Sequence, residues 1–126
     1  LLGVCESWMT PALFLSVAFI AGSVISFFTG SSWGTFAICI PIAVPMAYSF
    51  TGGQLGTLVY AAVGAVVSGG LFGDHCSPVS DTTVLSSLGA ACDHIDHVRT
   101  QLPYALLAAA VSIILWIVVA LVGGAV

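Results

Sequence analysis

The sequence predicts an all-α membrane protein, and its composition is the first observation that points there. Of the 126 residues, 60% are hydrophobic and only 5% are charged, and the mean hydropathy is +1.19. A soluble domain usually carries about 25% charged residues. A chain with so few charges has little surface to offer to water, so we expect the lipid bilayer to be its solvent.

The second observation is where the few charges lie. The charged residues are five acidic ones and one basic one: Glu6, Asp74, Asp81, Asp93, Asp96 and Arg99. Four of the five acids fall between residues 74 and 96. No basic patch is present, so nucleic-acid binding has no electrostatic basis. On either side of this acidic region lie long stretches that carry no charge and are long enough to span a membrane.

The first half of the chain predicts one clean span and one interrupted span. Residues from Pro11 to Phe28 carry no charge, and a spanning helix needs about 20 apolar residues, with a range of about 17 to 25. Residues from Phe36 to Phe50 are also apolar but contain Pro41 and Pro45. Proline kinks or breaks a helix interior, so we expect this stretch to be broken and too short for a full crossing.

The second half predicts two more spans with a short helix between them. Leu55 to Leu71 is rich in glycine, alanine and valine, and small residues at such spacing permit close contact between membrane helices. Val84 to Ala91 is typical of a short helical piece. Tyr104 to Val122 is a final span, and Pro103 suits the N-terminus of that helix.

Two polar segments interrupt the hydrophobic pattern, TGSSWGT at residues 29–35 and GDHCSPVSDTT at residues 73–83. Lipid offers no hydrogen bonds, so unwound chain at membrane depth survives only inside protein or beside a water-filled cavity. The freed oxygens suit a hard cation such as Na⁺, and paired interrupted segments are typical of a transporter's midplane site. A plain loop outside the membrane is the alternative for each segment.

Asp74 and Asp81 are the acidic residues of the second segment. An ionised aspartate at the bilayer centre costs about 2.5–3.5 kcal/mol unless it pairs with a cation, takes a proton or is hydrated. A carboxylate that holds Na⁺ and H⁺ in turn couples their fluxes, because the two ions compete for one group. Asp81, followed by two threonines, is also typical of a helix N-cap.

The polar segment CDHIDHVRT at residues 92–100 precedes the final span. His94 and His97 lie three residues apart, as do Asp93 and Asp96, and this mixture of nitrogen and oxygen atoms suits a metal ion. A polar helix cap or loop at the membrane interface is the simpler interpretation. Arg99 would place this segment in the cytoplasm by the positive-inside rule.

Three stretches resemble a known family: FFTGSSWGTFAICIPIAVP, FGDHCSPVSDTTVLSS and CDHIDHVRTQLPYAL. They look like the C-terminal part of the NhaC family of sodium/proton antiporters, which is similar to the wider ion-transporter superfamily of elevator-type carriers. The resemblance covers nearly the whole chain. It implies a fragment of a longer polytopic protein, namely one half of an inverted-repeat transporter.

The resemblance also implies an architecture and a site. Residues 11–47 would form a re-entrant hairpin with its tip at 29–34, and residues 55–91 a discontinuous helix broken at 73–81. Residues 92–100 would be an interfacial segment and 104–122 the final transmembrane helix. The tip and the break would meet at the ion or substrate site, whose residues would be Asp81, Asp74, Ser77, Ser80, Thr82, Thr29, Ser31 and Ser32.

The function implied is sodium/proton antiport in the cytoplasmic membrane of a bacterium, with Na⁺ and H⁺ as transported ions and no cofactor. One alternative keeps the scaffold and exchanges organic acids or amino acids, because the family includes such members. A distant alternative is an intramembrane metal-dependent enzyme that uses His75, His94, His97 and nearby aspartates. The first repeat is not in this chain, so either a longer native chain supplies it or two chains pair as a homodimer.

Overall fold

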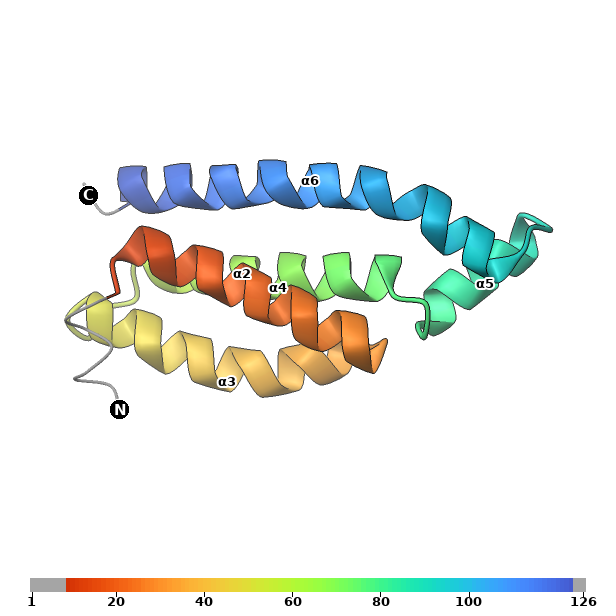
Figure 1. Ribbon diagram of the computed structural model, residues 1–126. Coiled ribbons are helices and arrows are strands. Elements are labelled where there is room, and N and C mark those ends of the chain that lie inside the picture. The colour runs from red at the N-terminus through yellow and green to blue at the C-terminus, as the bar shows by residue number, and fades with distance from the viewer. Residues whose placement is uncertain (1–8, 124–126) are drawn as a thin grey trace.

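The computed structural model describes residues 9–123 and is built from helices (Figure 1). In chain order these are α2 (Pro11–Thr29), α3 (Ser32–Phe50), α4 (Thr57–Cys76), α5 (Asp81–Gly89) and α6 (His94–Gly123). All of them except α5 are long enough and apolar enough to cross a membrane. The predicted all-α membrane fold is confirmed, and within the described range there is no strand.

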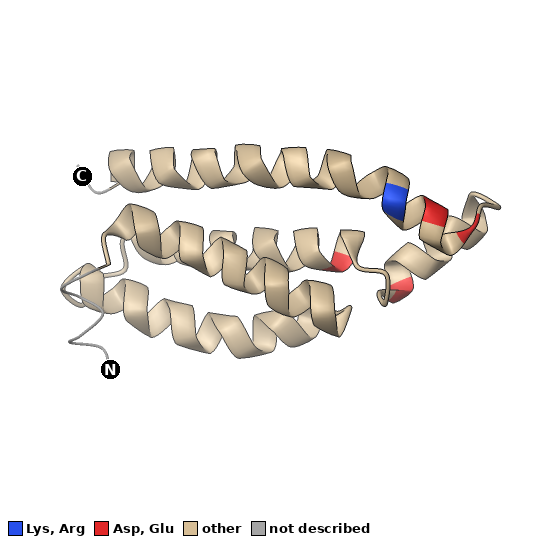
Figure 2. Ribbon diagram, viewed as in Figure 1, with Lys and Arg blue, Asp and Glu red and all other residues tan. Residues whose placement is uncertain are grey.

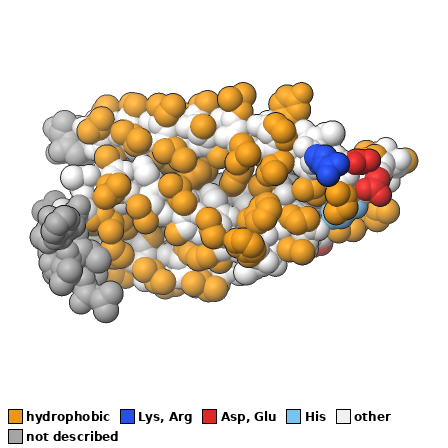
Figure 3. All heavy atoms as spheres, in the orientation of Figure 1, with side chains coloured by type: hydrophobic (Ala, Val, Ile, Leu, Met, Phe, Trp, Pro, Cys, Tyr) orange, Lys and Arg blue, Asp and Glu red, His pale blue; other side chains and the backbone are white. Residues whose placement is uncertain are grey.

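The four long helices lie side by side, and α5 projects obliquely from one end of the bundle (Figure 1). Helices α2 and α4 form the middle of the bundle, with α3 packed on one side and α6 on the other. The acidic side chains that the structure describes and Arg99 all lie towards the α5 end (Figure 2). Apolar side chains cover the length of the remaining surface in this view (Figure 3), as expected for helices that contact lipid.

Helices α2 and α4 pack more closely than any other pair, because glycines bring their backbones together. A Cβ atom added to Gly22 would lie 3.1 Å from the Val66 carbonyl oxygen, and one added to Gly69 would overlap the backbone of Phe19. The Ser26 hydroxyl adds a hydrogen bond of 2.6 Å to the Gly70 carbonyl oxygen. Such small-residue contacts are the usual means of association between helices in lipid.

The prediction that prolines would break the second apolar stretch is wrong. Helix α3 runs without interruption through Pro41 and Pro45. Each proline removes one backbone donor, but unwinding in an apolar environment would leave more backbone groups unpaired. Helices α2 and α3 each have 19 residues, about 28 Å at 1.5 Å per residue, so each is long enough to cross a membrane. The re-entrant hairpin stays a prediction.

The boundaries of the later elements also differ from those expected. Helix α4 continues to Cys76, so the unwound segment covers residues 77–80 rather than 73–81. Helix α6 begins at His94, ten residues before the expected Tyr104, and contains Pro103 in its interior. The carboxylate of Asp93 explains the early start, because it accepts hydrogen bonds from the Ile95 and Asp96 amides at 2.9 and 3.3 Å.

Candidate functional site

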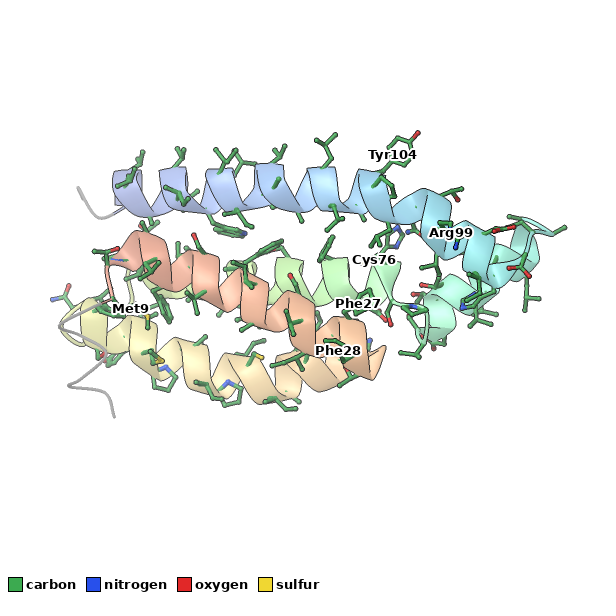
Figure 4. All side chains as sticks on the ribbon, in the orientation of Figure 1. Met9, Phe27, Phe28, Cys76, Arg99 and Tyr104 are labelled. Atoms are coloured by element: carbon green, nitrogen blue, oxygen red, sulfur yellow. The ribbon has the colours of Figure 1, made fainter. Side chains whose placement is uncertain are left out.

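The turn between α2 and α3 packs directly against the unwound segment between α4 and α5. Gly30 has a φ of 67°, and a Cβ there would lie 2.8 Å from the Val79 carbonyl oxygen. The Ser77 hydroxyl donates to the Phe27 carbonyl oxygen at 2.6 Å. Phe27 and Cys76 mark this junction in Figure 4. The structure therefore brings the two polar interruptions of the sequence together.

Asp74, in the last turn of α4, is the centre of a group of hydroxyls at this junction. Its Oδ1 accepts a hydrogen bond of 2.6 Å from Ser80, and its Oδ2 accepts one of 3.1 Å from Ser32. The Thr82 hydroxyl lies 2.8 Å from that of Ser80. We call Asp74, Ser32, Ser80 and Thr82 the Asp74 cluster. Ser32 and Ser80 are buried and Asp74 is half-buried, so the cluster forms a partly enclosed set of oxygen atoms.

Two helices begin at this cluster, which explains why the hydroxyls converge on Asp74. The Ser31 side chain caps α3 by accepting from the Gly34 amide at 3.3 Å. The Ser80 side chain caps α5 by accepting from the Thr82 amide at 3.3 Å. Serine is a favoured N-cap because its oxygen pairs with an otherwise free backbone donor. The N-termini of α3 and α5 carry partial positive charge, which complements the Asp74 carboxylate.

A cavity of about 500 Å³ between α4 and α6 reaches the cluster. Asp74, His75 and Thr82 line it at the end near the break, and Ser68 and Ser112 add hydroxyls farther along the two helices. The remaining lining is mainly apolar: Phe19, Leu71, Phe72, Ala105, Ala108 and Ala109. The cavity gives the cluster an opening large enough for a hydrated ion or a small organic molecule.

The other predicted site residues lie outside the cluster. Asp81 is exposed, and its carboxylate accepts a hydrogen bond of 2.8 Å from the Thr82 amide. Thr29 is exposed and donates to the Ile25 carbonyl oxygen. Ser31 serves as the cap of α3, and Ser77 joins the break to α2. The roles of these residues in ion binding stay predictions.

Three polar residues that sequence reasoning did not assign to the site hold the break in place. The buried Thr83 donates to the His75 carbonyl oxygen at 3.1 Å, and Gln101 Nε2 donates to the same oxygen at 3.1 Å. His94 Nε2 lies 2.7 Å from the Pro78 carbonyl oxygen. A usable signal was the spacing of His94 and Gln101, since residues seven apart lie on one face of a helix.

The predicted alternative of a metal centre has no geometric support in residues 9–123. No group of three or more histidine, cysteine, aspartate or glutamate side chains comes together there. His97 Nδ1 lies 3.8 Å from the Cys92 sulfur, whereas His94 bonds a backbone carbonyl. The polar segment before α6 instead provides the helix cap at Asp93. The oxygen atoms of the Asp74 cluster are the set that suits a hard cation.

Comparison with known proteins identifies the family to which the sequence is similar. A sequence profile described as the Na+/H+ antiporter family matches residues 3–121. The chain is 52% identical over 110 residues to an uncharacterized protein of Haemophilus influenzae. The match covers 86% of this chain and 20% of that protein.

Two further relatives carry functional names. The chain is 37% identical over 114 residues to the malate-2H(+)/Na(+)-lactate antiporter of Bacillus subtilis, which covers 90% of this chain and 23% of the relative. It is 32% identical over 113 residues to the Na(+)/H(+) antiporter NhaC of Alkalihalophilus pseudofirmus, with the same two shares. The chain thus spans about a fifth to a quarter of the length of these relatives. No solved structure matches it.

Proposed function

The chain belongs to the Na+/H+ antiporter family, and from that premise we propose that the full-length protein exchanges Na⁺ for H⁺ across the bacterial cytoplasmic membrane. The chain is part of a multi-pass integral membrane protein and of a transporter family. The observation that carries the proposal is the Asp74 carboxylate, bonded by the Ser32 and Ser80 hydroxyls where two helices begin.

The chemistry of the exchange follows from the atoms of the Asp74 cluster. A hydroxyl is both a donor and an acceptor, so Ser32 and Ser80 can donate to Asp74 when the site is empty and turn lone pairs towards a bound Na⁺. The carboxylate binds either Na⁺ or a proton, and occupation by one excludes the other. Competition for this single group is what couples the two fluxes. The remaining ligands of the ion come from water or from the part of the protein outside this chain.

The position of the cluster also suits transport. The cavity between α4 and α6 reaches Asp74 and Thr82, and it offers an ion a path along hydroxyls at Ser68 and Ser112. We infer that the other half of the site comes from a part of the protein outside these residues or from a second copy in a homodimer. No cofactor takes part in this scheme, and Na⁺ and H⁺ are the transported ions.

A second candidate is exchange of an organic anion on the same scaffold. The Bacillus subtilis relative is named for malate and lactate as well as for H⁺ and Na⁺. The partial positive charges at the N-termini of α3 and α5 can receive a carboxylate, and the cavity has room for a small acid. Arg99, the only basic residue, is exposed on α6, so this candidate depends on helix N-termini rather than on an arginine.

The test uses the full-length protein in proteoliposomes that contain a pH-sensitive dye. We expect an imposed Na⁺ gradient to move protons, and we expect Asp74→Asn to reduce this movement to the background of empty liposomes. Asp96→Asn, which changes an exposed carboxylate at the start of α6, is the matched control and keeps the rate. Proton movement that survives in Asp74→Asn contradicts the proposal. Uptake of labelled malate without any Na⁺-driven pH change favours the second candidate.

A further inference from the structure

Two prolines lie on the outer face of helix α3. The residues of α3 that share this side of the helix and are exposed are Gly34, Ala37, Pro41, Pro45 and Tyr48. We call these five residues the α3 proline face. It points away from α2 and α4, because buried residues of α3 such as Thr35 and Ala43 lie on the opposite side of the helix.

Each proline leaves one backbone carbonyl without its partner inside the helix. In an α-helix the carbonyl of one residue accepts a hydrogen bond from the amide four residues later, and proline has no amide hydrogen. Pro41 therefore frees the carbonyl of Ala37, and Pro45 frees the carbonyl of Pro41. The hydroxyls of Thr35 and Ser49, on the same helix, donate to other carbonyls.

The two freed carbonyls lie in the apolar part of the molecule. Pro41 is midway between Ser32 and Phe50, the two ends of α3, and this helix is apolar enough to cross a membrane. The proline inside α6 differs, because Pro103 frees the carbonyl of Arg99, in the polar segment that precedes the apolar part of that helix. Lipid has no hydrogen-bond donor for an unpaired carbonyl, so the α3 proline face needs donors from another source.

The α3 proline face also lacks the side chains expected of a surface that contacts lipid. The outer face of α6 carries large exposed aliphatic side chains, namely Leu107, Val111, Ile114 and Val118. From Gly34 to Pro45 the α3 proline face has only glycine, alanine and proline, and such small side chains allow another helix to approach closely. The bulkier neighbours Ile38 and Ile42 line the groove between α3 and α2 instead. A water-filled path would be lined by polar side chains, which this stretch of the face does not have.

We propose that a membrane helix from the part of the protein outside these residues packs on the α3 proline face and donates hydrogen bonds to the carbonyls of Ala37 and Pro41. Small side chains on that helix allow the close approach, and a serine, threonine, asparagine or glutamine supplies each donor. Relatives of this chain have sequence to provide such a helix, because the chain spans only about a fifth to a quarter of their length.

A second copy of this chain fits the face less well. In a symmetric dimer within one membrane the two α3 helices would run parallel, so each residue would meet its counterpart at the same depth. Among the residues of the α3 proline face, only Tyr48 has a side chain that can donate. It lies eleven residues beyond Ala37, about 16 Å along the helix, so it cannot donate to the Ala37 carbonyl. The proposed interface does not depend on which ions or substrates the protein transports.

The first test measures what surrounds the α3 proline face. A nitroxide spin label is attached at Ala37→Cys in the full-length protein in liposomes, with the native cysteines replaced by alanine. Ile114→Cys, on the outer face of α6, is the lipid-facing control. We expect the label at residue 37 to collide severalfold less often with oxygen, which dissolves in lipid, and to be shielded from a water-soluble nickel chelate. Oxygen collisions as frequent as at residue 114, or frequent nickel collisions, overturn the proposal.

A second pair of variants changes the bulk of one side chain and keeps a good helix former. Ala37→Leu adds three carbon atoms where we expect a close contact between helices, and overpacking lowers stability. Ala110→Leu adds the same atoms to an exposed alanine of α6, where lipid moves aside. We expect a lower unfolding temperature of the full-length protein for Ala37→Leu and the wild-type value for Ala110→Leu. An Ala37→Leu protein as stable as the Ala110→Leu protein contradicts the proposal.

Photocrosslinking identifies the helix that covers the face. Benzoylphenylalanine in place of Tyr48 should crosslink within one copy of the full-length protein, to a peptide outside residues 1–126. The same amino acid in place of Tyr104, which is exposed on α6, should crosslink mainly to lipid. A crosslinked dimer from the Tyr48 position shows that a second copy covers the face, and a lipid adduct there shows that no helix does. Either result overturns the proposal.

Discussion

The two sides of the α4–α5 break contain the same residue types in very different surroundings. On the α4 side, Asp74 is half-buried among hydroxyls, and Gly73 lies against the backbone of α2. On the α5 side, Asp81 is exposed, and Gly89 has open space where a side chain would be. Ser80 is buried at the start of α5, whereas Ser86, later in the same helix, is exposed.

This difference teaches that contact with the α2–α3 turn, rather than residue type, produces the candidate site. Helix α5 packs on α4 and α6 but not on α2 or α3 to a comparable extent. The carboxylate nearest the turn receives hydroxyls from α3 and from the break. The carboxylate seven residues later receives only the amide of the next residue. Substitutions matched across the break can test this distinction.

The largest effect on stability should come from adding one methyl group on the α4 side. In Gly73→Ala the new Cβ would lie 2.7 Å from the Phe27 nitrogen and closer still to the Ser23 carbonyl oxygen. Overpacking a tight contact costs about 1–3 kcal/mol, and backbone atoms cannot move aside as side chains do. We expect a clearly lower unfolding temperature of the full-length protein in detergent.

The control is Gly89→Ala, at the end of α5. Nothing lies within 4 Å of a Cβ there, and alanine is the better helix former by about 1 kcal/mol. The unfolding temperature should be unchanged or slightly higher. An equal fall in unfolding temperature in Gly73→Ala and Gly89→Ala would show that the two sides of the break are packed equally tightly.

An intermediate effect is expected from the hydroxyls. Ser80→Ala removes the 2.6 Å hydrogen bond to Asp74 and the cap of α5, and a hydrogen bond to a charged group contributes about 1.5–3 kcal/mol. We expect the Na⁺ concentration for half-maximal exchange to rise by roughly tenfold or more. Ser86→Ala, exposed on the same helix, should leave it unchanged. A wild-type value in Ser80→Ala would show that this hydroxyl is not a ligand.

The smallest effect is expected at Asp81. Its carboxylate bonds the Thr82 amide in the first turn of α5, and an acidic residue at that position contributes about 0.3–1 kcal/mol to a helix. Asp81→Asn should therefore lower stability slightly and change the exchange rate in proteoliposomes by no more than about twofold. A loss of exchange as complete as that expected for Asp74→Asn would show that the two sides of the break contribute equally.

Much of the architecture follows from patterns in the sequence. The apolar runs around Phe19 and Ile114 are long and free of charge. In lipid their backbone groups must bond to one another, so they form helices. The family is confirmed by the profile match and by the relative named NhaC. The serines before α3 and α5 have the usual chemistry of N-caps. The meeting of the α2–α3 turn with the break was implied by resemblance and is present in the structure.

The remaining details depend on tertiary contacts that no local pattern records. Gly73 reads as a turn residue, but it is helical because α2 leaves no room for a side chain. Pro41 reads as a helix breaker and Pro103 as the start of a helix, but both lie inside helices. In lipid, no water is available to pair with the backbone groups that unwinding would free. Asp74 and Asp81 are equally acidic in sequence, and only the fold reveals which one is surrounded by hydroxyls.

The close contact of α2 with α4 has a mechanical consequence. Where Gly69 and Gly73 lie, carbonyl oxygens of α2 occupy the volume that a side chain would fill. A shift of α4 by one residue would place Phe72 or Asp74 where Gly73 now lies, and their side chains would overlap that backbone. We therefore expect helices α2 and α4 to move together as one rigid body, and any change of access to Asp74 to bend the chain outside this pair.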